Sequence, residues 1–175
     1  RAGGTPVMEK SGHAFIKTTL LRRQAVMGGE ISGHFFFGEL GRDDGLYATL
    51  LMLQMLDEST QGLAEMVDTV PRYPITPDLR LPASPSEVQA ILAELREAFA
   101  QRNDVEVSTL DGLRIERRDG WALIRPSVTQ PLVTLRFEAH SDASLREIRQ
   151  MVMAESVSLQ RVMGRYNGDL EADIA

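Results

Sequence analysis

The chain contains no cysteine and only three histidines, His13, His34 and His140, among its 175 residues. Without cysteine, disulfides, thiolate catalysis and cysteine-based metal sites are excluded. Three scattered histidines also argue against a histidine-rich metal site. Basic residues are outnumbered, with 19 Lys and Arg against 25 Asp and Glu, and they form no long run. This charge balance argues against a nucleic-acid-binding protein.

Long hydrophobic runs are also absent. No apolar stretch approaches the roughly 20 residues that a membrane-spanning helix needs, and no signal-peptide pattern opens the chain. We therefore expect a cytoplasmic protein with no membrane partner. The 43% hydrophobic and 25% charged residues are typical of globular proteins, and the length suits one domain or two small ones.

The most informative stretch covers residues 28–34, which read Gly-Gly-Glu-Ile-Ser-Gly-His and are followed by three phenylalanines. We predict strands over 25–30 and 34–37, joined by a tight turn in which Glu30, Ser32 and His34 point the same way. A carboxylate, a hydroxyl and an imidazole together can recognise adjacent hydroxyl groups, as on a sugar. The alternative is a solvated glutamate, a turn serine and a partly buried histidine.

Two features flank this stretch. Residues 14–23 are predicted to form a helix, and Lys10 and His13 lie at its N-terminus, where free backbone N–H groups favour an anion. The alternative is that His13 caps the helix and Lys10 is solvated. Further on, Asp43 is predicted to cap a helix over 44–56, with metal binding as the alternative. That helix is apolar nearly all round, which predicts burial.

Closely spaced prolines at 71–77 divide the chain into predicted domains 1–70 and 71–175. The first has an α/β pattern, for which we expect a mixed sheet. The second begins with an edge strand at 78–81 and a capping box at Ser84 and Glu87. Two Asp-Gly hairpins, a strand at 132–138 and a last helix follow. We predict a βαβββα fold, with an antiparallel sheet and two helices on one side.

A polar loop at 125–131 is the chemical feature of the second domain. Arg125 offers a forked guanidinium, Ser127 and Thr129 offer hydroxyls, and Val128 contributes a backbone N–H. Such groups suit a phosphate dianion. The alternative is a polar hairpin loop without a ligand.

Three of these motifs resemble the α-D-phosphohexomutases, the family of phosphoglucomutase and phosphomannomutase. Gly-Glu-Ile-Ser-Gly-His is similar to the family's sugar-specificity loop, and Lys-Ser-Gly-His, twenty residues earlier, is similar to its Lys-Thr-Gly-His. The loop at 125–131 resembles Arg-x-Ser-Asn-Thr-x-Pro or Arg-x-Ser-Gly-Thr-x-Pro. Val128 departs from that pattern and removes a side-chain amide, which puts the strength of phosphate binding in doubt.

The resemblance implies a C-terminal fragment that comprises part of family domain 3 and all of domain 4, the latter with a TATA-box-binding-protein-like fold. The opening βα unit of domain 3 would then be missing, which would expose a sheet edge and apolar surface. The implied activity is that of an isomerase, an intramolecular phosphotransferase that interconverts hexose 1-phosphate and hexose 6-phosphate. The implied roles are catalysis for Lys10 and for His13, a proton carrier; sugar binding for Glu30, Ser32 and His34; and phosphate binding for Arg125, Ser127, Val128 and Thr129.

For the full-length enzyme the resemblance also implies Mg²⁺ and a glucose 1,6-bisphosphate-type activator. This chain contains neither an Asp-x-Asp-x-Asp metal loop nor a serine resembling the family's phosphoserine, so we expect no metal site and no activity in the chain alone. Expected partners are a phosphohexose, the missing N-terminal domains and a second copy bound at the exposed edge. The apolar Ile31 resembles the methionine that glucose/mannose enzymes tend to have at this position more than the glutamine of the glucosamine enzymes. The alternative function is a stand-alone, non-catalytic sugar-phosphate-binding module.

Overall fold

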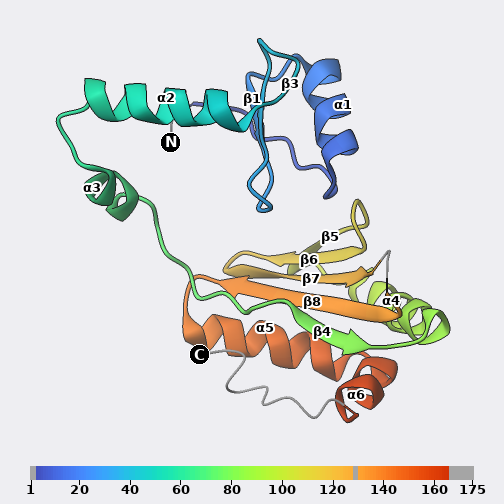
Figure 1. The fold of residues 1–175 in the computed structure, drawn as a ribbon. Coiled ribbons are helices and arrows are strands. Elements are labelled where there is room, and N and C mark those ends of the chain that lie inside the picture. Colours follow the sequence, from blue (N-terminus) through green and yellow to red (C-terminus); the bar gives the residue numbers. More distant parts are fainter. Residues whose placement is uncertain (1–2, 128–129, 166–175) are drawn as a thin grey trace. The chain divides into compact units, whose positions relative to one another are not determined.

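The chain forms two compact units, Arg1–Pro71 and Arg72–Ala175 (Figure 1). The structure is a computed structural model that describes residues 3–127 and 130–165. Within these residues, no helix is both long enough and apolar enough to cross a membrane.

Unit 1 contains a small sheet, preceded in the chain by one helix and followed by two. Its elements are α1 (His13–Arg23), β1 (Met27–Gly29), β2 (Phe35–Phe37), β3 (Arg42–Asp43), α2 (Gly45–Glu58) and α3 (Leu63–Asp68). The strands are ordered β1-β2-β3 and both pairings are antiparallel, whereas the sequence predicted a mixed sheet. The reason is the length of the connections: a few residues can join antiparallel strands, but a parallel pair needs a crossover of a dozen or more.

Helix α2 is exposed along its whole length, so the prediction that it is buried is wrong. None of its residues is buried, and Leu46 and Leu53 keep 72% and 57% of their surface in solvent. Its contact with β2 includes an edge-to-face pair between Tyr47 and Phe37, with ring centroids 4.8 Å apart. The apolar residues of α2 also border an open hollow of about 510 Å³ beside Phe35. Unit 1 therefore presents apolar surface to solvent.

Unit 2 is an antiparallel sheet with its helices on one side. Its elements are β4 (Leu79–Pro82), α4 (Pro85–Phe99), β5 (Val105–Ser108), β6 (Leu113–Arg117), β7 (Gly120–Pro126), β8 (Leu132–Ala139), α5 (Asp142–Ala154) and α6 (Val157–Met163). The strand order is β4-β8-β7-β6-β5. Four strands follow α4, as the two predicted Asp-Gly hairpins and the predicted strand at 132–138 require, so the shorthand βαβββα is one strand short. The predicted edge strand is confirmed as β4, which pairs with β8 alone.

Side-chain caps set the helix boundaries in unit 2. The predicted capping box is confirmed, because Ser84 accepts a hydrogen bond from the Glu87 amide and Glu87 accepts one from the Ser84 amide. The predicted last helix is divided in two at Ser156, whose hydroxyl accepts a hydrogen bond from the Leu159 amide. The Glu94 carboxylate of α4 accepts a hydrogen bond of 2.7 Å from the Ser156 hydroxyl. This bond ties the junction between α5 and α6 to α4.

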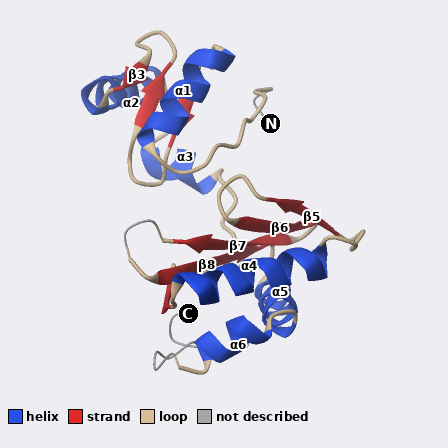
Figure 2. Cartoon of the chain, turned by 90° about the vertical axis from the view of Figure 1, so that its right-hand side faces the viewer, coloured by secondary structure: helices blue, strands red, loops and turns tan. Residues whose placement is uncertain are grey.

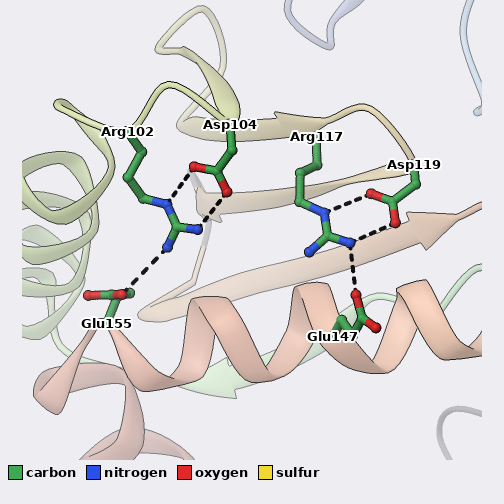
Figure 3. A network of polar contacts seen from close by, with 6 residues as sticks. All are labelled: Arg102, Asp104, Arg117, Asp119, Glu147 and Glu155. Atoms are coloured by element: carbon green, nitrogen blue, oxygen red, sulfur yellow. Dashed lines mark hydrogen bonds and ion pairs between the residues drawn. The ribbon is translucent and has the colours of Figure 1, made fainter.

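The core of unit 2 lies between the sheet and its helices. Alternate residues of β8 are buried, and Figure 2 shows α4, α5 and α6 on the same side of the sheet. An ion-pair network secures the arrangement at the surface (Figure 3). Arg117 of β6 donates two hydrogen bonds to Asp119 and a third, of 3.0 Å, to Glu147 of α5. The guanidinium of Arg117 also holds the pKa of Asp119 well below its usual value.

Candidate functional site

Two histidines of unit 1 share one carboxylate. Nε2 of His13 lies 2.7 Å from Oδ1 of Asp43, and Nδ1 of His34 lies 2.8 Å from Oδ2 of the same group. Both imidazoles are 46% exposed, so they face solvent while Asp43 is three-quarters covered. Hydrogen bonds from His13 and then from His34 lower the pKa of Asp43 to about 2, which keeps this carboxylate ionised across the physiological range.

The fold of unit 1 explains how this cluster forms. His13 is the first residue of α1, His34 immediately precedes β2, and Asp43 ends β3. The antiparallel register places Asp43 opposite Phe36, whose side chain is completely buried. The ring of Phe36 lies 5.1 Å from that of His13 and 6.3 Å from that of His34, so it forms an apolar floor beneath both imidazoles.

The turn before β2 is tight, as the sequence predicts. The amides of Glu30 and Gly33 bond to the carbonyls of His34 and Glu30, and Gly33 adopts a φ of 89°, which favours glycine. The Ser32 hydroxyl donates to Oε2 of Glu30 at 2.8 Å, so these two predicted sugar-binding groups point together. His34 instead turns toward Asp43. The predicted common direction thus holds for Glu30 and Ser32 only, because the chain reverses between Ser32 and His34.

The second oxygen of Glu30 reaches the segment before α1. Oε1 of Glu30 accepts a hydrogen bond of 2.9 Å from the Gly12 amide. The structure shows no side-chain cap at this end of α1, so the alternative role of His13 as a cap is not observed. The region predicted to attract an anion therefore already holds a carboxylate of the chain itself, which fixes the turn that carries Glu30 beside His13.

Lys10 is held over an aromatic ring. Its Nζ lies 3.7 Å from the centroid of Phe15, in the first turn of α1, and a cation–π contact of this kind restrains the ammonium group. The neighbouring Glu9 accepts hydrogen bonds from the Thr19 hydroxyl and from the Lys10 amide, which lower its pKa. The segment that carries Lys10 is therefore anchored to α1 on both sides.

The predicted phosphate loop of unit 2 is described only in part. Ser127 lies at its start, where its amide donates to the Leu132 carbonyl and its hydroxyl accepts from the Gln130 amide. Val128 and Thr129 lie outside the described residues. Arg125, in β7, is about one-third exposed, and its Nε lies 3.4 Å from Oδ1 of Asp111 in the hairpin turn between β5 and β6. Arg125 and Ser127 thus lie on adjoining parts of one hairpin.

Asp43 is the site residue that the sequence interpretation assigned wrongly. The cap of α2 is Asp44, whose carboxylate accepts a hydrogen bond from the Tyr47 amide. The sequence signal was present, since two adjacent aspartates precede the helix and only one can cap it. Asp111 was also missed, because the Asp-Gly pair is fully explained as a turn signal.

A Mg²⁺ site needs several oxygen ligands gathered around one point. Nowhere among residues 3–127 and 130–165 do three His, Asp or Glu side chains gather in a way that could hold a metal ion. The carboxylate of Asp43 is committed to two imidazole N–H groups. These residues therefore do not fit a metal site.

The chain matches two models of one protein family. Residues 1–73 match the phosphoglucomutase/phosphomannomutase alpha/beta/alpha domain III, and residues 84–155 match the C-terminal domain of phosphoglucomutase/phosphomannomutase. Together the two models cover most of the chain.

Similar proteins and structures carry the same names. A phosphomannomutase/phosphoglucomutase from Pseudomonas syringae pv. tomato is 37% identical over 155 residues, covering 87% of this chain and 33% of that protein. A phosphoglucomutase from Neisseria gonorrhoeae is 40% identical over 156 residues, covering 87% of this chain and 34% of that protein. The crystal structure of a phosphoglucomutase/phosphomannomutase family protein from Burkholderia thailandensis matches with a TM-score of 0.77 and 38% identity. The match covers 94% of this chain and 34% of that protein. The chain spans about a third of the length of these relatives.

Proposed function

Because this chain belongs to the phosphoglucomutase/phosphomannomutase family, we propose that it is the sugar- and phosphate-recognition part of a phosphohexomutase. The proposed reaction interconverts hexose 1-phosphate and hexose 6-phosphate, with glucose or mannose as the hexose. The observation that carries the proposal is the cluster in unit 1, where His13, His34, Glu30 and Ser32 lie on one polar surface held by Asp43 and Gly12.

Unit 1 is proposed to recognise the hydroxyl groups of the sugar. A carboxylate accepts hydrogen bonds, and each neutral imidazole has one nitrogen that accepts and one that donates. Glu30 keeps lone pairs beyond the two hydrogen bonds described above, so it can accept from a sugar hydroxyl. His13 is proposed to carry a proton, and Lys10 to contribute positive charge near the phosphosugar.

Unit 2 is proposed to bind a phosphate group through Arg125, Ser127, Val128 and Thr129. The guanidinium fork suits two phosphate oxygens at once, and an amide at Val128 can donate whatever its side chain is. The Asp111 carboxylate holds one edge of this guanidinium, which limits the orientations that the fork can take.

Phosphoryl transfer needs a donor, and the sequence contains no loop resembling the family's phosphoserine or Asp-x-Asp-x-Asp motifs. We therefore propose that the chain alone does not catalyse the reaction. Mg²⁺ and a hexose 1,6-bisphosphate activator are proposed for a longer protein that contains these units. The absence of those motifs equally favours the second candidate, a stand-alone sugar-phosphate-binding module without catalysis.

The test is a calorimetric titration of the 175-residue chain with glucose 1-phosphate, repeated for Arg125→Ala. Binding that is lost in this variant supports the proposal, and no binding by the wild-type chain at millimolar ligand contradicts it. Arg114→Ala is the matched control, because Arg114 lies in the adjacent strand, pairs with Glu116 and stacks on Trp121. An assay for glucose 6-phosphate, run on this chain and on a longer protein that contains it, separates the two candidate functions.

A further inference from the structure

The carboxylate of Asp43 contacts a different nitrogen on each histidine. It meets Nε2 of His13 and Nδ1 of His34, at 2.7 and 2.8 Å. Both distances are typical of short, charge-assisted hydrogen bonds. The two imidazoles therefore face the shared group through chemically different edges.

An ionised carboxylate can only accept hydrogen bonds, so both facing nitrogens must carry a proton. In a neutral imidazole the other nitrogen then has no proton and presents a lone pair. For His13 the bare nitrogen is Nδ1, and for His34 it is Nε2. The low pKa of Asp43 supports this assignment, because it keeps the carboxylate in its acceptor-only form.

Competing partners for the facing nitrogens are absent among the described contacts. The face of the cluster away from solvent is the hydrocarbon ring of Phe36, which is buried and offers no acceptor. The adjacent cation Arg42 pairs with Asp44, at 3.4 Å, rather than with Asp43. The carboxylate of Asp43 thus serves the two imidazoles.

We propose that Asp43 is a positioning residue that fixes opposite tautomers on the two histidines, leaving Nδ1 of His13 and Nε2 of His34 as bare acceptors for substrate hydroxyl groups. The ligand of this inference rests on the proposed function, whereas the assignment of the tautomers rests on the contacts of Asp43 alone. With Glu30, the two imidazoles give unit 1 three acceptors for hydroxyl protons.

The tautomers can be measured directly by long-range ¹H–¹⁵N NMR of the labelled chain at about pH 9, where imidazoles are neutral. The expected wild-type spectrum shows the proton on Nε2 of His13 and on Nδ1 of His34. A proton on Nε2 of neutral His34 would overturn the proposal. This reading uses the unmodified chain, so it does not depend on whether a variant folds.

Asp43→Asn supplies the second reading. An asparagine amide accepts through its oxygen but donates through its nitrogen, so one of the two histidines should change tautomer. Asp44→Asn is the matched control, because it removes the same charge one residue away and asparagine caps helices as well as aspartate does. Both tautomers should persist in Asp44→Asn. His140, which packs against Tyr73, is the internal reference and should not change in either variant.

Binding separates this inference from the proposed function. Asp43→Asn is expected to weaken glucose 1-phosphate binding about tenfold, the effect of one misdirected hydrogen bond. Correct tautomers in a wild-type chain that does not bind would refute the proposed ligand and leave the positioning role intact. Altered tautomers in Asp43→Asn with unchanged affinity would refute the positioning role.

Discussion

The carboxylate of Glu30 accepts a hydrogen bond of 2.9 Å from the amide of Gly12, eighteen residues earlier in the chain. This contact joins the turn that carries Glu30 and Ser32 to the start of the helix that carries His13. One side chain therefore sets the spacing between two predicted parts of the sugar site.

Removal of that carboxylate should release the Gly12 amide. In Glu30→Ala the half-buried N–H loses its acceptor, at a cost of about 1 kcal/mol, so its hydrogen exchange should become roughly fivefold to tenfold faster. Ser32→Ala is the control, because it removes the bond to Oε2 and leaves the bond to Oε1 in place. Equal exchange rates at Gly12 in wild type and Glu30→Ala would contradict the contact.

Gly120 of unit 2 is expected to tolerate a side chain poorly. A Cβ at this position would lie 2.4 Å from the Glu138 carbonyl oxygen and 2.6 Å from Cδ1 of Ile148. Gly120→Ala should therefore lower the free energy of unfolding by more than about 2 kcal/mol, since strand β7 or helix α5 must shift. Gly164→Ala, where the nearest atom would be 3.4 Å away, should change it by less than about 0.5 kcal/mol. Urea titration followed by Trp121 fluorescence measures both.

Acid should destabilise unit 2 through the carboxylates that cap its helices. Hydrogen bonds from the Ser84 amide and from Arg165 lower the pKa of Glu87 from 4.5 to about 2. A lowered carboxyl pKa means that the stabilisation is fully present above about 4.5 and is lost as the pH falls toward 2. Stability of Glu87→Gln should thus depend less on pH across this window than that of wild type.

The control for the acid experiment is Glu97→Gln, which changes an exposed glutamate of the same helix. Circular dichroism of urea unfolding at several pH values between 2 and 6 gives the comparison. A Glu87→Gln curve parallel to that of wild type would show that the cap does not contribute to the acid response.

Truncation of a buried and of an exposed apolar side chain of unit 1 should have different effects on stability. Phe36 is fully buried, so Phe36→Ala should cost about 3–5 kcal/mol and unfold the unit or nearly so. Leu53 keeps 57% of its surface in solvent, so Leu53→Ala should cost less than about 0.5 kcal/mol. NMR signals of unit 1 during urea titration report this difference, and Trp121 in unit 2 serves as the reference. A large loss in Leu53→Ala would mean that α2 is covered in solution.

The sequence determined the elements whose causes are local. The capping box at Ser84 and Glu87, the Asp-Gly hairpin turns and the alternation of β8 all depend on residues a few positions apart, and each is present in the structure. The three loop motifs also identified the family that the two domain models match. Motifs carry this information because they hold side chains at fixed short spacings.

Tertiary structure decided which of two adjacent aspartates does what. Asp43 and Asp44 are equivalent as local helix signals, but pairing of β3 with β2 places Asp43 beside Phe36 and leaves Asp44 to cap α2. The contact between Asp43 and His13 spans thirty residues, a separation at which no local pattern exists. The exposure of α2 was also undetermined by sequence, because periodicity shows which side chains are apolar and not what packs against them.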